Sequence, residues 1–167
     1  MADYPTGSQN QVLNKLLKQA LAGSEALVPN SEHELAIIDT SEDGSSKLPE
    51  TATKPPLDDT FRAFIARSLE DAAKHVGDAH YFALIDNRSG EDDTTLLVCC
   101  GQEDGALETV RTTFKSVQTS LVSLGIASLG FNEIQSIAGS QGGVYGRPTT
   151  TPQRGGPAPR MRLGGGS

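Results

Sequence analysis

The feature that most constrains the fold is a pair of apolar runs joined by a polar segment. Residues 80–86 read HYFALID, residues 94–100 read TTLLVCC, and the polar segment NRSGEDD lies between them. Runs of this length and composition favour strands, and the polar connection predicts an antiparallel hairpin. Because apolar residues follow one another without alternation, we expect both faces of the sheet to be covered.

Three amphipathic helices are expected around this hairpin. The first begins at Ser8 with a capping-box pattern and ends at Gly23. The second begins near Asp58, a good N-cap residue, and ends at Gly77. The third ends at Gly125, and its apolar residues recur in steps of three and four at Leu107, Val110, Phe114, Val117, Leu121 and Leu124.

The apolar stripe of the third helix is narrow, as in helices that pack on one neighbour. It predicts either a core helix or a helix at the interface of a homodimer. The candidate interface residues are Leu107, Val110, Phe114, Val117 and Leu121.

The segments outside these elements give weaker signals. Residues 35–38 form a short apolar run that predicts a strand. Residues 40–57 are acidic, rich in serine and threonine, and contain three prolines, which predicts a long exposed loop. Residues 126–137 fit a short helix or an edge strand, and the edge strand is favoured.

The element order predicts a small α/β (α+β) sandwich with a mainly antiparallel sheet and about three helices. The chain divides into an N-terminal helix and strand (1–39), an acidic flexible linker (40–57), an α/β core (58–138) and a disordered tail (139–167). The tail holds nine of the 18 glycines and four of the nine prolines. Such a segment buries too little apolar surface to offset the loss of chain entropy.

Composition excludes some classes of protein. No apolar run approaches the roughly 20 residues that a membrane-spanning helix needs. The N-terminus, MADYPTGSQN, has no basic start and no apolar stretch, so no signal peptide is expected. The two cysteines, Cys99 and Cys100, are adjacent and cannot form a disulfide framework. We expect a cytoplasmic protein, or a virion component if the function is viral.

Charge is distributed unevenly along the chain. All 21 acidic residues lie at or before Glu133, and only four arginines follow. Arginines spaced among glycines can reach successive phosphates, and one tyrosine offers a face on which a base can stack. There are three alternatives: the tail tethers a protein partner, it is inert, or it contacts the acidic body. The candidate residues for single-stranded RNA are Arg147, Arg154, Arg160, Arg162 and Tyr145.

No arrangement of residues indicates a reaction, a metal site or a cofactor. Residues 39–50 fit the outline of a calcium-binding loop, but Pro49 interrupts the helix that should follow it. Asp39 and Asp86 end predicted strands, where magnesium ligands and turn-forming aspartates are both found. Cys99 has no adjacent base or positive charge to activate it. We therefore expect a protein that is not an enzyme.

In overall plan the chain resembles the packaging accessory proteins of the double-stranded RNA bacteriophages (cystoviruses). The matching features are the size, a core through Ile137 and a Gly/Arg/Pro tail from Gly139 onward. That resemblance implies a dimeric α/β core, a mobile tail, and a role in capsid assembly and RNA packaging. The hairpin followed by a long helix is also similar to roadblock-type dimerisation domains, which implies a scaffold built from two subunits.

Two functions follow as expectations. The first is a non-enzymatic assembly protein, in which a dimeric core joins a larger protein assembly and the arginine tail touches single-stranded RNA. The alternative is a protein–protein scaffold of the roadblock-like type with an inert tail.

Overall fold

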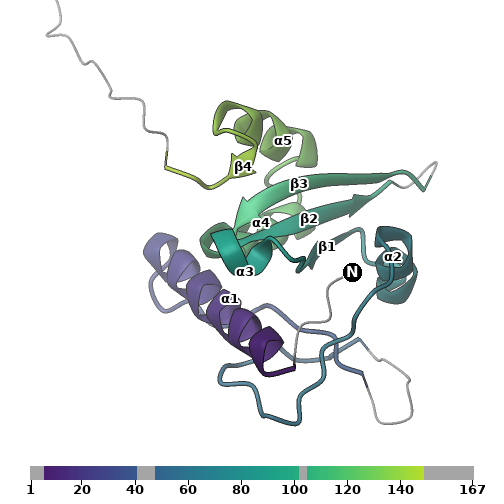
Figure 1. Ribbon diagram of the computed structural model, residues 1–167. Helices are drawn as coiled ribbons and strands as arrows, with labels where there is room; N and C mark the ends of the chain where they lie inside the picture. The colour runs from purple at the N-terminus through teal and green to yellow at the C-terminus, as the bar shows by residue number, and fades with distance from the viewer. Residues whose placement is uncertain (1–5, 41–47, 102–104, 149–167) are drawn as a thin grey trace, which may run out of the picture.

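The computed structural model describes residues 6–40, 48–101 and 105–148. Within these ranges the chain forms an α+β fold with a four-stranded mixed sheet (Figure 1). The strand order is β1-β2-β3-β4; the first three strands are antiparallel, and β4 is parallel to β3. The elements are α1 (Thr6–Leu27), α2 (Leu69–Val76), β1 (Tyr81–Leu84), α3 (Ser89–Asp92), β2 (Thr94–Cys100), β3 (Leu107–Thr113), α4 (Phe114–Gly125), α5 (Phe131–Ser140) and β4 (Val144–Tyr145).

The predicted hairpin is confirmed as β1 and β2. Ala83 lies opposite Leu97, and Phe82 lies opposite Val98. The polar connection contains the single-turn helix α3, and Asp93 follows it in the left-handed conformation with φ of 56°. No helix within the described ranges is long and apolar enough to cross a membrane.

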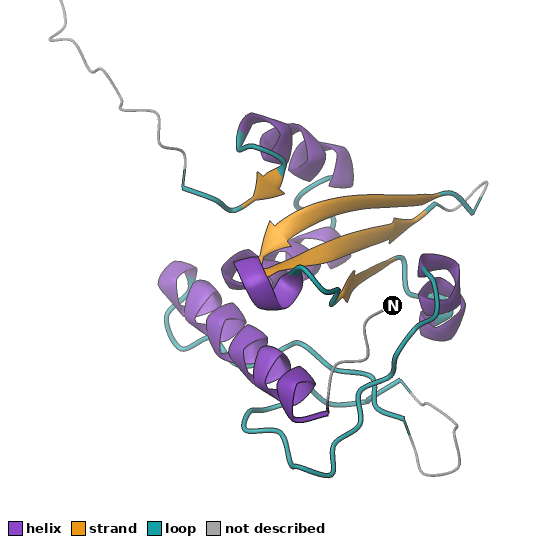
Figure 2. Cartoon of the chain, viewed as in Figure 1, coloured by secondary structure: helices purple, strands orange, loops and turns teal. Residues whose placement is uncertain are grey.

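Two helices cover one face of the sheet, and a third helix packs outside them (Figure 2). Leu97 and Val110, which are paired across β2 and β3, share a buried cluster with Val117 of α4 and Ile134 of α5. α1 packs against α4 rather than directly on the sheet. The arrangement is therefore the sheet, then α4 and α5 on one face, and α1 over α4 alone.

The helix predicted from Leu107 to Gly125 is wrong in its first half. Leu107 and Val110 lie on strand β3, and α4 begins only at Phe114. The sequence from Thr109 to Thr113 is rich in β-branched residues, which fit a pleated sheet better than a helix. A spacing of three and four residues cannot distinguish this strand from the first turns of a helix.

The first helix is longer than its predicted range of Ser8 to Gly23. α1 continues to Leu27, because Gly23 does not end the helix but lies against the backbone of Lys115 on α4. A glycine in that place allows two helices to approach closely.

The second helix is shorter than predicted. It begins after Ser68, whose side chain accepts a hydrogen bond from the backbone N–H of Asp71 at 3.2 Å. Asp58 does not cap a helix; its carboxylate accepts from the N–H and the hydroxyl of Thr60 and so forms a turn. The predicted end at Gly77 is confirmed, and Gly77 has φ of 62°.

The C-terminal part of the fold differs from the prediction in two ways. Residues 131–140 form helix α5 instead of an edge strand, and the carboxylate of Glu133 accepts the N–H of Gly130 at its start. Residues 139–148 belong to the fold, because Val144 is buried in β4 beside β3. The boundary placed at Gly139 therefore cuts through the folded part of the chain, and residues 149–167 lie outside the described residues.

Residues 28–68, of which 41–47 are not described, form a segment that we call the strap. It contains residues 35–38, for which the prediction of a strand is wrong, since they belong to no strand and lie outside the sheet. An isolated antiparallel bridge joins Asp39 to Ala63 within the strap. Amide side chains of two helices hold it: Asn14 of α1 accepts from Leu57, and Gln118 of α4 donates to the carbonyl of Glu32.

Candidate binding cavity at the edge of the sheet

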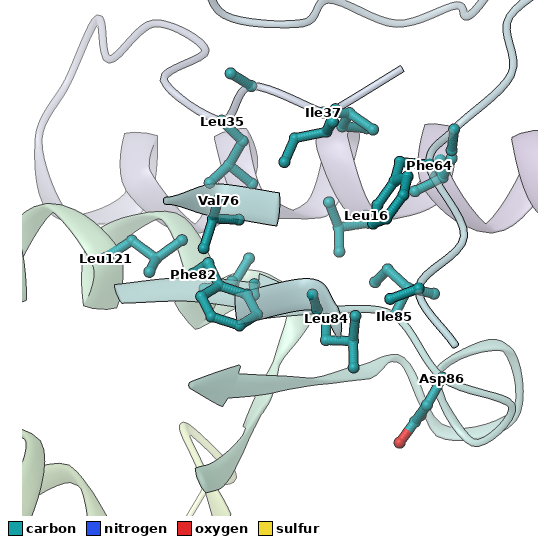
Figure 3. A pocket seen from close by; sticks show the side chains of 18 of the residues that line it. Leu16, Leu35, Ile37, Phe64, Val76, Phe82, Leu84, Ile85, Asp86 and Leu121 are labelled. Carbon is teal, nitrogen blue, oxygen red and sulfur yellow. The ribbon is translucent and has the colours of Figure 1, made fainter. Parts of the chain in front are cut away.

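An apolar cavity of about 1200 Å³ lies between the strap, α1, α2 and strand β1. Figure 3 shows side chains from these separate segments pointing toward a common space. The labelled residues that line it are Leu16, Leu35, Ile37, Phe64, Val76, Phe82, Leu84, Ile85, Asp86 and Leu121.

The cavity runs along the outer edge of β1. Residues 81–85 line it without interruption. Since successive side chains of a strand point to opposite faces, consecutive residues can line one space only where it borders the edge of the strand. β1 is the last strand on its side of the sheet.

The strap forms the opposite wall, and its residues also line the cavity consecutively. Residues 35–38 and 63–68 line the cavity consecutively. These two stretches run side by side, with Phe64 N–H donating to the Ile38 carbonyl at 2.8 Å and Thr40 N–H donating to the Arg62 carbonyl at 2.7 Å. The cavity is thus bounded by strand β1 on one side and by these two stretches of the strap on the other.

The negative charge of Asp86 at one end of the cavity is balanced by Arg111 of the same chain. Asp86 lies at its margin, and Figure 3 shows the carboxylate pointing away from the apolar side chains. Arg111, whose side chain is only 12% exposed, forms an ion pair with Asp86 and donates to Thr94 Oγ1 at 2.9 Å. Burial acts to raise the pKa of Asp86, but hydrogen bonds from Arg111 and Ser89 and the nearby positive charge outweigh it and lower that pKa.

The other carboxylates of the hairpin connection are also paired. Asp93 Oδ1 lies 2.6 Å from Lys15 Nζ on α1. Asp92 Oδ2 lies 2.8 Å from Arg88 Nε. Partial burial acts to raise the pKa of Asp92, but hydrogen bonds from Thr94 and Arg88 lower it overall. The described residues contain no group of three or more histidine, cysteine and acidic side chains placed to hold a metal ion. Most of the calcium-loop pattern, residues 41–47, lies outside them.

Two of the five residues predicted to contact RNA lie in the folded part. Tyr145 is half-buried in β4, next to the core. Arg147 Nη2 lies 3.8 Å from Asp92 Oδ2, so this arginine contacts the acidic body of its own chain. Arg154, Arg160 and Arg162 lie outside the described residues.

The predicted interface residues are divided between the core and the cavity. Val110, Phe114 and Val117 are buried inside the chain, which agrees with the core interpretation of the stripe. Leu107 is half-buried on β3, and Leu121 lines the cavity. A dimer through the whole stripe would require Phe114 and Val117 to leave the core.

The pKa of the Cys99 thiol is raised, which argues against a reactive thiol at this position. Cys99 and Cys100 are both half-buried and free on β2. Burial, followed by the neighbouring Glu108 and Cys100, raises the pKa of the Cys99 thiol. A thiol held in its protonated form is a poor nucleophile.

Sequence reasoning missed the cavity because its walls are about 50 residues apart in the chain. The one available signal was the presence of two similar apolar runs, LAII at 35–38 and FALI at 82–85. Both were expected to be strands, and both border the same cavity. The function has to be argued from this site, since a fold does not determine a function. No protein-family model, curated protein or solved structure matches this chain.

Proposed function

We propose that this chain is a non-enzymatic assembly protein whose folded part binds another protein at the cavity beside β1. The observation that carries the proposal is the outer edge of β1, which no strand of the described residues pairs with and which opens onto an apolar space of about 1200 Å³. Exposed strand edges tend to pair with other chains. β1 reads YFAL and has none of the charges or prolines that block such pairing.

The chemistry of the remaining polar groups supports binding over catalysis. Asp86 was considered above as a magnesium ligand, and it and its neighbours Asp92 and Asp93 are each paired with an arginine or a lysine. Carboxylates that are hydrogen-bonded and paired in this way hold the fold together. With these carboxylates paired, the apolar cavity is the remaining candidate for a binding site in the described part of the chain.

Photo-cross-linking in the cells that naturally make the protein tests this function. Ile65 is 60% exposed at the cavity, and Leu27 is 71% exposed at the end of α1 without lining it. Replacing Ile65 by p-benzoylphenylalanine should cross-link one protein at one reproducible site. The same replacement at Leu27 is the matched control. Cross-links at both positions to the same mixture of proteins, or none at position 65, would contradict the proposal.

A second candidate function is contact with single-stranded RNA through the tail. It is favoured by the absence of acidic residues after Glu133 and by the four arginines that follow. A mobile tail on a dimeric core, with a role in RNA packaging, is also what the resemblance to cystoviral packaging proteins implies, and a cytoplasmic or virion location would suit it. Homodimerisation remains part of this proposal, through a surface other than the buried Phe114 and Val117.

Fluorescence anisotropy with a labelled single-stranded RNA tests the tail. We expect full-length protein to bind in a salt-sensitive way and a chain ending at Pro148 to lose most of that binding. Binding of equal strength by both chains would remove the tail from the proposal and leave the protein-binding function standing.

A further inference from the structure

We infer that the partner bound at the cavity is a single extended apolar peptide segment, which enters between β1 and the strap and adds a strand to the sheet. This inference rests on the proposed function and names the form of the partner. Its basis is the backbone of β1, because a strand edge recognises another strand through main-chain hydrogen bonds.

The register shows which backbone groups are free. The N–H of Cys100 donates to the carbonyl of His80 at 2.8 Å, so these two residues form a hydrogen-bonded pair. In an antiparallel ladder such pairs alternate with non-bonded pairs. Phe82 therefore bonds to β2, whereas the N–H and C=O groups of Tyr81 and Ala83 point outward along the cavity. Within the described residues no strand pairs with them.

The size of the cavity favours a peptide over a small molecule. Pockets for small ligands measure about 300–1000 Å³, and this one exceeds that range. Four residues of β1 at about 3.3 Å each give an edge of about 13 Å, enough for a strand of about four residues. The lining is mainly aliphatic and aromatic, so apolar side chains suit the inserted segment.

The strap argues against a second folded copy as the occupant. Pairing of two β1 edges would bring a whole sheet with its helices alongside β1. The strap and α1 stand on that side, and Leu35, Ile37 and Leu16 close the space from across the cavity. A single strand needs far less room than a sheet edge with its covering helices.

The variants for the test follow from the same geometry. Ala83→Pro removes an outward N–H while leaving the bonds between β1 and β2 in place. Ile65→Glu puts a charge on an exposed residue at the mouth of the cavity, and Leu27→Glu is the matched change outside it. Circular dichroism and thermal midpoints establish whether each variant is folded. If Ala83→Pro unfolds, the comparison of Ile65→Glu with Leu27→Glu still tests the inference.

The experiment selects binders to the full-length chain from a random 12-residue peptide library and measures their affinity by fluorescence polarisation. We expect apolar β-prone peptides whose affinity falls at least tenfold in Ala83→Pro and Ile65→Glu but stays unchanged in Leu27→Glu. Peptides that bind all three variants equally, or no enrichment at all, would overturn the inference.

Two further results would also overturn it by identifying another occupant. A mass that doubles with concentration and reverts to monomer in Ala83→Pro would make the occupant a second copy. Peptide binding that appears only after removal of residues 149–167 would make it the chain's own tail. A partner cross-linked from position 65 whose binding survives Ala83→Pro would refute strand addition while leaving the proposed function intact.

Discussion

Gly23 and Lys115 mark the closest approach of α1 and α4. A Cβ atom added to Gly23 would lie 1.8 Å from the carbonyl oxygen of Lys115, well inside van der Waals contact. Only a residue without a side chain fits at this crossing. The contact fixes α1, which forms one wall of the cavity.

The first prediction concerns this crossing. Gly23→Ala should destabilise the fold by about 1–3 kcal/mol, because overpacking outweighs the gain of about 1 kcal/mol in helix propensity. Gly139→Ala in α5 is the matched control; its added Cβ meets nothing within 4 Å. That control should be neutral or stabilising by up to about 1 kcal/mol. Urea unfolding monitored by circular dichroism measures both, and equal effects would contradict the close packing.

The second prediction concerns Gln118, a buried residue that ties the strap to two helices. Its amide donates to Ser24 Oγ and to the Glu32 carbonyl, both at 2.9 Å, and accepts from Glu34 N–H at 3.3 Å. Gln118→Ala should cost about 1–3 kcal/mol, because buried partners lose their hydrogen bonds. Hydrogen exchange at Glu34 should accelerate more than in α5. Unchanged exchange at Glu34 would show that the strap is held elsewhere.

The third prediction is a pH dependence that arises from Asp86. The pKa of Asp86 is lowered in the folded protein, so its contribution to stability is complete above the ordinary carboxyl pKa and is lost as pH falls through the lower folded value. Asp86→Asn should therefore lower the unfolding free energy by about 1–3 kcal/mol at pH 7. The difference from wild type should shrink below about pH 4.

Urea titrations at pH 7, 5 and 3 provide this measurement. Asp59→Asn, at an exposed carboxylate, serves as the control. A difference for Asp86→Asn that stays constant from pH 7 to pH 3 would mean that the ion pair with Arg111 does not stabilise the fold.

The fourth prediction separates the tail arginines by position. Arg147 already contacts Asp92, whereas three arginines follow the described residues. Replacing Arg154, Arg160 and Arg162 by alanine should weaken RNA binding about tenfold or more at low salt and reduce its salt dependence. Arg147→Ala should change it less, because that charge is partly neutralised. Fluorescence anisotropy measures RNA binding by both variants. A larger loss of binding in Arg147→Ala than in the triple variant would contradict the prediction.

The sequence predicted part of the local structure. The hairpin and the end of α2 at Gly77 were predicted, because two short apolar runs joined by a polar segment and a terminal glycine are local signals. The start of α4 was not, since the residues from Leu107 to Phe114 fit both a strand and a helix by spacing alone. α5 was missed, because Gly130 offers no side chain as a capping signal.

The cavity could not be predicted from local sequence patterns, for a different reason. Phe82 and Ile37 were both assigned to strands, but no pattern indicates that a cavity separates them. That arrangement depends on long-range contacts such as Asn14 with Leu57, which hold the strap away from β1. Polar side chains that tie distant segments together leave no periodic signal in a sequence.

Amide hydrogen exchange of the purified chain, resolved residue by residue by NMR, tests the central claim most directly. If the outer edge of β1 is free to bind a strand, the amides of Phe82 and Leu84 exchange slowly while those of Tyr81 and Ala83 exchange fast. Fast exchange at the two outward amides is the result that we predict. Equal protection of all four amides would mean that the edge is already paired, and it would contradict the proposed binding site.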